Sequence, residues 1–155
     1  MVLENKMILT FTACSENESF ARNAVACFAL KLNPSLSEIS DIKTAVSEAV
    51  TNSIVHGYPE NDGEITIEAK IICNELHIKI LDKGVGIENL EQALEPFFTT
   101  KADEERSGMG FTIMENFMDE LFVKSELGKG TTVTMSKRIS SNKVETLSKD
   151  GVFAN

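Results

Sequence analysis

The sequence lacks any run of about eighteen apolar residues, and its first residues lack the apolar stretch of a secretory signal peptide. It also has few cysteines: Cys14, Cys27 and Cys73 are widely spaced and form no Cys-x-x-Cys pair. These absences argue against a membrane-spanning or secreted protein. We therefore expect a cytoplasmic protein without membrane contact. We expect Cys27 to be a reduced core residue, because it falls among apolar residues of a predicted helix.

Positive charge is scarce as well. The chain has 15 Lys and Arg residues against 24 Asp and Glu residues, a net charge of −9. Nucleic-acid binding depends on the neutralisation of phosphates by Lys and Arg, so this balance argues against a direct nucleic-acid partner. It suits a protein partner with a basic surface.

The length and composition are typical of one globular domain, since the 155 residues are 42% hydrophobic and 25% charged. We assign residues 1–139 to this domain. Residues 140–155 are mainly polar and have no apolar periodicity, so we expect them to form a disordered tail.

Apolar periodicity predicts the order βα-α-ββ-α-ββ along the chain. The five expected strands cover residues 6–12, 65–71, 76–80, 121–126 and 131–137, and the three main helices cover 15–32, 36–57 and 110–119. In the first helix we expect a capping box at Ser15 and Glu18, with Phe20 and Cys27 among the inward residues. This order predicts an α/β (α+β) two-layer sandwich, with helices on one face of a mixed, mostly antiparallel sheet of about five strands.

The helix over residues 36–57 carries an unusual polar side. Its apolar residues recur at three- and four-residue steps, which places Asp41, Glu48 and Asn52 on the opposite side. Glu48 could accept a proton, and the amide oxygen of Asn52 could bind a hard cation such as Mg²⁺. Taken alone, the same pattern is also that of an exposed amphipathic helix.

Two glycine segments favour a nucleotide site. Asp82 stands where a strand ends and the tight turn containing Gly84 and Gly86 begins, so its carboxylate could accept a hydrogen bond from the amine of a base. Gly108 and Gly110 open a helix, whose free amides suit phosphate. The Walker sequence Gly-x-x-x-x-Gly-Lys-Ser/Thr is absent, and the segment after Gly86 is too short for a Rossmann crossover helix.

These motifs resemble those of the gyrase/Hsp90/histidine-kinase/MutL ATPase superfamily. The likeness rests on four segments in order, Glu48-x-x-x-Asn52-x-x-x-His56, Asp82-x-Gly84-x-Gly86, Pro96-Phe-Phe-Thr-Thr-Lys101 and Gly108-Met109-Gly110. The resemblance implies the Bergerat-type ATP-binding fold of that superfamily. Residues 15–22, 47–52 and 105–119 are more narrowly similar to the sporulation anti-sigma-F factor family.

The narrower resemblance covers residues 5–138 and implies two activities. Members of that family bind a sporulation sigma factor (sigma F), and they are ATP-dependent protein serine/threonine kinases that phosphorylate a serine of an anti-anti-sigma partner. The resemblance also implies ATP or ADP and Mg²⁺ as ligands, and a homodimer that holds one sigma chain.

Site roles follow from the same resemblance. Glu48 is implied as the general base or the group that orients the attacking hydroxyl, Asn52 as the Mg²⁺ ligand, and Arg22 as a contact for both protein partners. The remaining residues implied to bind the nucleotide are Asp82, Gly84, Gly86, Thr99, Lys101, Arg106, Ser107, Gly108, Met109, Gly110 and Thr131.

Three alternative functions remain open from the sequence. An anti-sigma kinase of a general-stress sigma factor shares the same motifs. The ATP-binding domain of a sensor histidine kinase is disfavoured, because neither His56 nor His77 lies on a predicted dimerisation helix. In the third alternative, the chain only binds its partners and ATP acts as a structural switch. Glu48 is the residue that distinguishes such a binding protein from a kinase.

Overall fold

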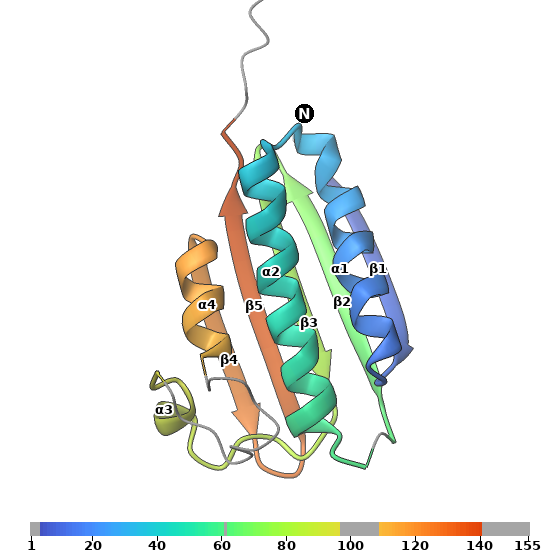
Figure 1. Ribbon diagram of the computed structural model, residues 1–155, viewed down its shortest axis with the longest axis vertical. Coiled ribbons are helices and arrows are strands. Elements are labelled where there is room, and N and C mark those ends of the chain that lie inside the picture. Colours follow the sequence, from blue (N-terminus) through green and yellow to red (C-terminus); the bar gives the residue numbers. More distant parts are fainter. Residues whose placement is uncertain (1–3, 61, 97–108, 141–155) are drawn as a thin grey trace, which may run out of the picture.

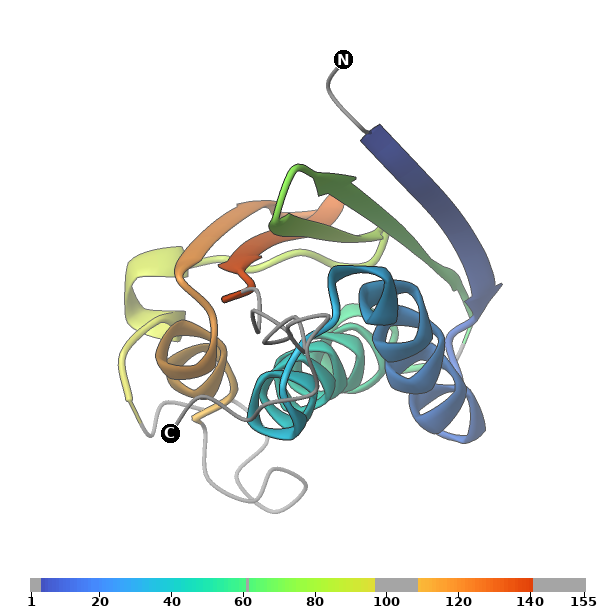
Figure 2. The same ribbon diagram turned by 90° about the horizontal axis from the view of Figure 1, so that it is seen from above.

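A computed structural model of the chain describes residues 4–60, 62–96 and 109–140. The helices lie on one face of a five-stranded sheet (Figures 1 and 2). In chain order the elements are β1 (Glu4–Thr12), α1 (Glu16–Ala29), a 3-10 turn (Leu30–Leu32), α2 (Leu36–Asn52), a π-helical turn η2 (Ser53–Gly57), β2 (Glu64–Ile72), β3 (Glu75–Asp82), α3 (Leu90–Ala93), α4 (Gly110–Phe117), β4 (Glu120–Glu126) and β5 (Gly130–Arg138). The expected disordered tail lies outside the described residues, apart from Ser140.

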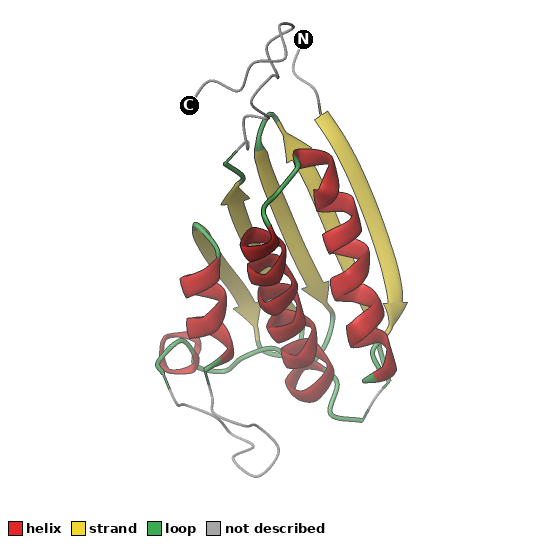
Figure 3. Cartoon of the chain, turned by 45° about the horizontal axis from the view of Figure 1, so that its top comes forward, coloured by secondary structure: helices red, strands yellow, loops and turns green. Residues whose placement is uncertain are grey.

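The strands are ordered β1-β2-β3-β5-β4, and all four neighbouring pairs are antiparallel. The predicted two-layer sandwich is therefore confirmed, with a sheet that is antiparallel throughout. Alternate residues of β2 and β3 are buried, as the period-two pattern predicts for a sheet covered on one face. Figure 3 shows the three longer helices, in red, packed against that face.

Helix α2 lies at the centre of the helical layer, between α1 and α4 (Figure 1). Ser35 caps its first turn by accepting a hydrogen bond from the Glu38 amide at 3.1 Å. The predicted apolar stripe is buried, with Ile42, Val46 and Val50 fully enclosed. The helix ends in the π-helical turn η2, where Asn52 and the residues after it reach the end of the sheet.

Two expectations about α1 are wrong. Phe20 is 52% exposed and Cys27 is exposed, because the buried stripe runs through Ala21, Val25 and Phe28 instead. The capping box is also absent: Ser15 has helical dihedral angles and its side chain makes no cap hydrogen bond. Because Ala21 and Val25 are smaller than Phe20, they allow α1 to pack closely against α2, and their side of the helix is therefore the buried one.

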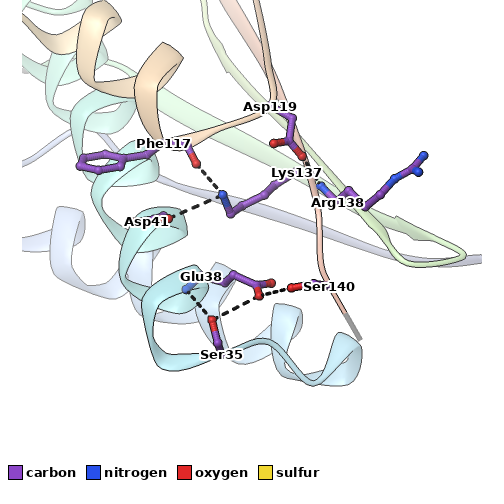
Figure 4. A network of polar contacts seen from close by, with 8 residues as sticks. All are labelled: Ser35, Glu38, Asp41, Phe117, Asp119, Lys137, Arg138 and Ser140. Atoms are coloured by element: carbon purple, nitrogen blue, oxygen red, sulfur yellow. Dashed lines mark hydrogen bonds and ion pairs between the residues drawn. The ribbon is translucent and has the colours of Figure 1, made fainter. Parts of the chain in front are cut away.

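A polar network joins the ends of α2, α4 and β5 (Figure 4). Lys137 Nζ donates to the Phe117 carbonyl at 2.7 Å, at the C-terminus of α4, and pairs with Asp41 of α2 at 3.6 Å. The Arg138 amide donates to Asp119 Oδ2 at 2.6 Å. Lys137 is only 12% exposed, so its charge stabilises the C-terminal end of the α4 dipole in a partly buried position. The network fixes how α4 lies relative to α2.

Among the described residues no helix is long and apolar enough to cross a membrane.

Candidate nucleotide site

A cavity of about 500 Å³ lies where α2, β3, α3 and the start of α4 come together. Figure 1 shows these elements at the same end of the sheet. Its lining comes from α2 and η2, from the segment after β3, from the first residues of α4, and from β5. The predicted site residues that line it are Asn52, Asp82, Gly86, Gly110 and Thr131. Asn52 and Thr131, 79 residues apart in sequence, therefore meet in one pocket, and His56 is also in the lining.

Asp82, the last residue of β3, is only 7% exposed and is held by three hydrogen bonds. Its Oδ2 accepts from the Ser53 hydroxyl at 2.7 Å, and its Oδ1 accepts from the Gly84 amide at 3.0 Å and the Thr131 amide at 3.2 Å. An ionised carboxylate is only an acceptor, so Asp82 presents a fixed negative group at the closed side of the cavity. The sequence predicted Asp82 but not Ser53, which falls in the apolar stripe of its helix.

The turn after Asp82 lies directly against the end of the α2–η2 helix. A Cβ at Gly84 would lie 2.1 Å from the Gly57 carbonyl oxygen, and that oxygen accepts a hydrogen bond from the Val85 amide at 2.9 Å. Only glycine permits this approach. Gly86 has a positive φ of 74°, which carries the chain past β4 toward α3.

Tyr58 fixes the same turn from outside the cavity. The Lys83 amide donates to its phenol oxygen at 2.6 Å, and the phenol donates to the Glu64 carbonyl at 2.8 Å. Burial raises the pKa of Tyr58, and the nearby Asp82 charge acts in the same direction, while the Lys83 amide lowers it. The phenol is thus held neutral as a bridge between β2 and the turn. Tyr58 was not among the predicted site residues, because its hydrogen-bond partners lie up to 25 positions away in the sequence.

Glu48 and Asn52 lie against the first residue of α4. A Cβ at Gly110 would lie 3.0 Å from Asn52 Nδ2, 3.2 Å from Asn52 Oδ1 and 3.3 Å from Glu48 Oε2. The N-terminus of α4 therefore faces the acid and the amide that were predicted to act on phosphate and metal. The N-cap residue, Met109, makes no side-chain cap hydrogen bond. The start of this eight-residue helix presents amides and a positive dipole end to the cavity side.

Asn52 fits the usual way in which Mg²⁺ is held beside phosphates. In such sites one or two protein oxygens bind the ion, and phosphate and water oxygens complete its coordination. The described part of the chain has no group of three or more His, Cys, Asp or Glu side chains that could hold a metal without such help. A single amide oxygen in the cavity lining, beside the start of α4, fits an ion that would be held jointly with a phosphate ligand.

Glu48 also borders a second hollow, of about 370 Å³, between α1 and α2. Arg22 and Ser47 line the same hollow. Arg22 Nη1 contacts both carboxylate oxygens of Glu18 at 2.8 Å, and Glu18 also accepts from the Ser47 hydroxyl. Arg22 is therefore held beside Ser47, the residue that precedes Glu48.

Several predicted residues are not placed by this geometry. Thr99, Lys101, Arg106, Ser107 and Gly108 lie outside the described residues.

His77 was not predicted to be a phosphoacceptor. It lies on β3, where its Nε2 is 3.5 Å from Glu75 Oε1, and it is not part of the cavity lining.

Comparison with known proteins identifies the family. Residues 11–137 match the family model described as a histidine kinase-like ATPase domain. The chain is also 58% identical over 139 residues to the anti-sigma F factor of Clostridium acetobutylicum, which covers 90% of this chain and 97% of the relative. The chain belongs to the anti-sigma F factor family. The anti-sigma F factor of Thermoanaerobacter sp. is 57% identical over 143 residues, covering 92% of this chain and all of the relative.

Solved structures confirm the fold of this anti-sigma F family member. A crystal structure of the RsbU and RsbW domains of a Mycobacterium tuberculosis protein aligns with a TM-score of 0.62 at 19% identity, covering 87% of this chain and 32% of the other. The catalytic domain of the histidine kinase ThkA aligns with a TM-score of 0.53 at 16% identity, covering 86% and 97%. The match of residues 11–137 to the histidine kinase-like ATPase family model confirms the predicted superfamily. An ATPase domain of this kind binds nucleotide, so the cavity is the candidate nucleotide site.

Proposed function

We propose that the protein binds and inhibits a sporulation sigma factor of the sigma F type and uses Mg-ATP to phosphorylate a serine of an anti-anti-sigma partner. One observation carries the proposal: Asn52 and Glu48 converge on Gly110, at the start of α4 and beside the cavity that Asp82 closes. The anti-sigma F relatives support the inhibitory part. The proposal places the activity in the cytoplasm, where a sigma factor acts.

The base of ATP or ADP would bind at the Asp82 side of the cavity. The fixed carboxylate of Asp82 accepts a hydrogen bond from an exocyclic amine, and Thr131 lies beside it in the lining. Gly84 and Gly86 allow the backbone of the turn to approach the base and ribose closely. The apolar lining, which includes Val85, gives the ring surface a dry contact.

The phosphates would extend toward Asn52 and the start of α4. The amides of the first turn, from Met109 and Gly110 onward, can donate to phosphate oxygens, and the helix dipole favours negative charge there. Asn52 would hold Mg²⁺ through Oδ1. A bound Mg²⁺ would neutralise phosphate charge and orient the transferred group. Thr99, Lys101, Arg106, Ser107 and Gly108 are proposed to contribute further phosphate contacts.

Asn52→Ala tests the metal role. We expect calorimetry to show a loss of ATP affinity in the presence of Mg²⁺ and little change without it. An unaltered affinity in Mg²⁺ would refute a metal ligand at this position.

Glu48 would accept the proton of the attacking serine hydroxyl or orient that hydroxyl. Two positions suit it to this role. Its Oε2 lies 3.3 Å from where a Cβ of Gly110 would be, and Gly110 lines the cavity. Glu48 also lines the hollow between α1 and α2. A partner segment in the hollow would bring its hydroxyl to Glu48 from the side opposite the base. A positioned general base contributes about 10²–10⁴-fold to such a transfer.

Arg22 would contact the protein partners at the same hollow. Its guanidinium is held in place by Glu18 and remains 35% exposed, which leaves donors for a partner's acidic or carbonyl groups. The family resemblance further implies a homodimer that binds one sigma chain. Light scattering of the chain alone and with its sigma factor tests that assembly, for which two copies per sigma chain are expected.

The central test of the proposal is a transfer assay. The protein is incubated with labelled ATP, Mg²⁺ and the anti-anti-sigma protein encoded by the same genome, and the labelled residue is mapped. We expect one phosphoserine on the partner and no label on either histidine of this chain. Label on His56 or His77, or no transfer to the partner, would contradict a serine kinase.

A further inference from the structure

Lys137 of β5 joins α4 to α2 at the C-terminus of α4 (Figure 4). Its Nζ donates to the Phe117 carbonyl at 2.7 Å and lies 3.6 Å from Asp41 Oδ2 of α2. The last carbonyls of a helix have no partner within the helix, and Lys137 supplies one for Phe117, the last residue of α4. Because the Lys137 side chain is only 12% exposed, this charge-assisted bond lies largely out of water.

The other described anchors of α4 are apolar side chains. Met114 is fully buried, and Met118, which follows the helix, is 4% exposed. Such contacts hold α4 against α2 and β4, but they are not directional and do not by themselves prevent a tilt. Within the described part of the chain, the bond from Lys137 to Phe117 is the only hydrogen bond between α4 and another element.

The other end of the same helix pair is where Asn52 and Glu48 approach Gly110. The eight residues of α4 span about 12 Å, and α2 runs about 16 Å from Asp41 to Asn52. The two helices are therefore tied to each other at one end and meet at the proposed phosphate site at the other. A tilt of α4 would change the distance from its first amides to Asn52 and Glu48.

We infer that Lys137 is a positioning residue for phosphoryl transfer. It is not part of the cavity lining and acts through α4, by holding the start of that helix at the distance from Asn52 and Glu48 that transfer requires. The inference rests on the proposed function, because it requires that phosphates bind at the start of α4. A displacement of about 1 Å can cost about 10²-fold in rate. Asp82 draws its hydrogen-bond partners from other elements, so nucleotide affinity should change less than transfer.

The test measures steady-state transfer to the anti-anti-sigma protein for Lys137→Met, with kcat divided by the number of nucleotide sites that calorimetry counts. We expect kcat per site to fall about tenfold and the KM for ATP to stay within about twofold. Unfolded molecules bind no nucleotide, so a purely structural loss lowers the number of sites and leaves kcat per site unchanged. Lys79→Met is the matched control: Lys79 lies on β3, is 46% exposed and pairs with Glu68 of β2 at 3.9 Å, so its removal should leave both constants at wild-type values.

Asp41→Asn is a milder second variant. It removes the ion pair of Lys137 but keeps the bond to Phe117, so kcat per site should fall about threefold with an unchanged KM for ATP. An unchanged kcat per site in Lys137→Met would overturn the inference, and so would an equal loss in Lys79→Met. If Lys137→Met does not fold, an unchanged kcat per site in Asp41→Asn overturns it. A wild-type protein that transfers no phosphate would instead refute the proposed function, which is a different result.

Discussion

The two ends of the candidate nucleotide site are built in different ways. At the end proposed to bind the base (the base end), Asp82 has hydrogen-bond partners on both carboxylate oxygens, and a Cβ at Gly84 would lie 2.1 Å from backbone. At the end proposed to bind the phosphates (the phosphate end), side chains approach one glycine: a Cβ added at Gly110 would lie 3.0–3.3 Å from atoms of Asn52 and Glu48. The first end is made by backbone and strand pairing, and the second by two helices that meet.

Under the proposed function, this difference predicts that nucleotide binding depends on the base end and phosphoryl transfer on the phosphate end. The base end is completed by folding, because η2, the turn after β3 and β5 supply the hydrogen-bond partners of Asp82. The phosphate end depends on how α4 lies relative to α2, which Lys137 fixes from the far end of α4. We expect changes at the base end to reduce stability and affinity together, and changes at the phosphate end to alter transfer with less effect on the fold.

The largest loss of affinity is expected for Asp82→Asn. The NH2 group of Asn would replace an oxygen that accepts either the Ser53 hydroxyl or two backbone amides, and the substitution removes the charge that is proposed to accept the base amine. Hydrogen bonds to a charged group contribute about 1.5–3 kcal/mol each, so ATP affinity should fall by that amount or more. Calorimetry measures the affinity, and thermal unfolding measures the accompanying loss of stability.

Asp41→Asn is the matched control for this change. Asp41 is also a carboxylate on the helical side, but it pairs with Lys137 and is outside the cavity lining. Its substitution should leave ATP affinity within about twofold, since a partly exposed ion pair contributes about 1 kcal/mol or less to stability. Equal losses of affinity in both variants would remove the special role of Asp82.

A pair of alanine substitutions compares the two ends directly. Gly84→Ala forces a methyl group into the Gly57 backbone, and such overpacking costs about 1–3 kcal/mol of unfolding free energy. Gly110→Ala meets only side chains that can shift by a few tenths of an ångström. We therefore expect the first variant to unfold at a lower temperature and the second to keep its stability but transfer phosphate more slowly. The reverse pattern would contradict the contrast between the two ends.

A smaller effect is expected for Tyr58→Phe, which removes the phenol bridge between Lys83 and Glu64. Loss of these hydrogen bonds, with one amide left unpaired, should cost about 1–3 kcal/mol of unfolding free energy at pH 7. Because burial raises the pKa of Tyr58, the folded state favours the neutral phenol. That contribution is present below pH 10 and is lost as the pH rises further, so the difference between wild type and variant should narrow in alkali.

Tyr58 is the only tyrosine in the chain, so phenolate absorbance reports its ionisation alone. A spectrophotometric titration should show a midpoint above about 10, the ordinary value for tyrosine, in the folded protein. A midpoint at or below the ordinary value would show that the phenol is not held as the bridge requires.

The smallest effect on nucleotide binding is expected for Arg22→Glu. Arg22 lies in the hollow between α1 and α2, apart from the cavity lining, so ATP affinity should not change. Sigma-factor affinity should fall at least tenfold, because the contact charge is reversed and the new Glu lies beside Glu18. Lys31→Glu makes the same charge change farther along the chain and should bind sigma factor normally in a parallel titration. Equal sigma affinity for Arg22→Glu would end the partner role.

The sequence predicted what is periodic or local. Alternation along residues 65–71 and 76–80 predicted the two strands, the stripe of α2 predicted its buried face, and the spacing of Glu48 and Asn52 predicted that they share a side. The sequence did not predict features that depend on packing between distant segments, such as which face of α1 is buried. Phe20 was expected inside α1 on apolar character alone, yet the smaller Ala21 and Val25 pack there.

The supporting residues of the site were missed for the same reason. Ser53 and Tyr58 each act through a partner 29 or 25 positions away in the sequence. A polar residue within an apolar stripe is a signal that could have found Ser53, since a buried hydroxyl requires a partner.

One measurement tests the division between binding and transfer most directly: ATP affinity and phosphoryl transfer for Glu48→Gln, assayed side by side with the anti-anti-sigma protein. The amide keeps the shape of Glu48 against Gly110 but cannot take a proton. We predict ATP affinity within about twofold of the wild type and a fall in transfer rate of about 10²–10⁴-fold. Transfer at the wild-type rate would contradict a catalytic role for Glu48.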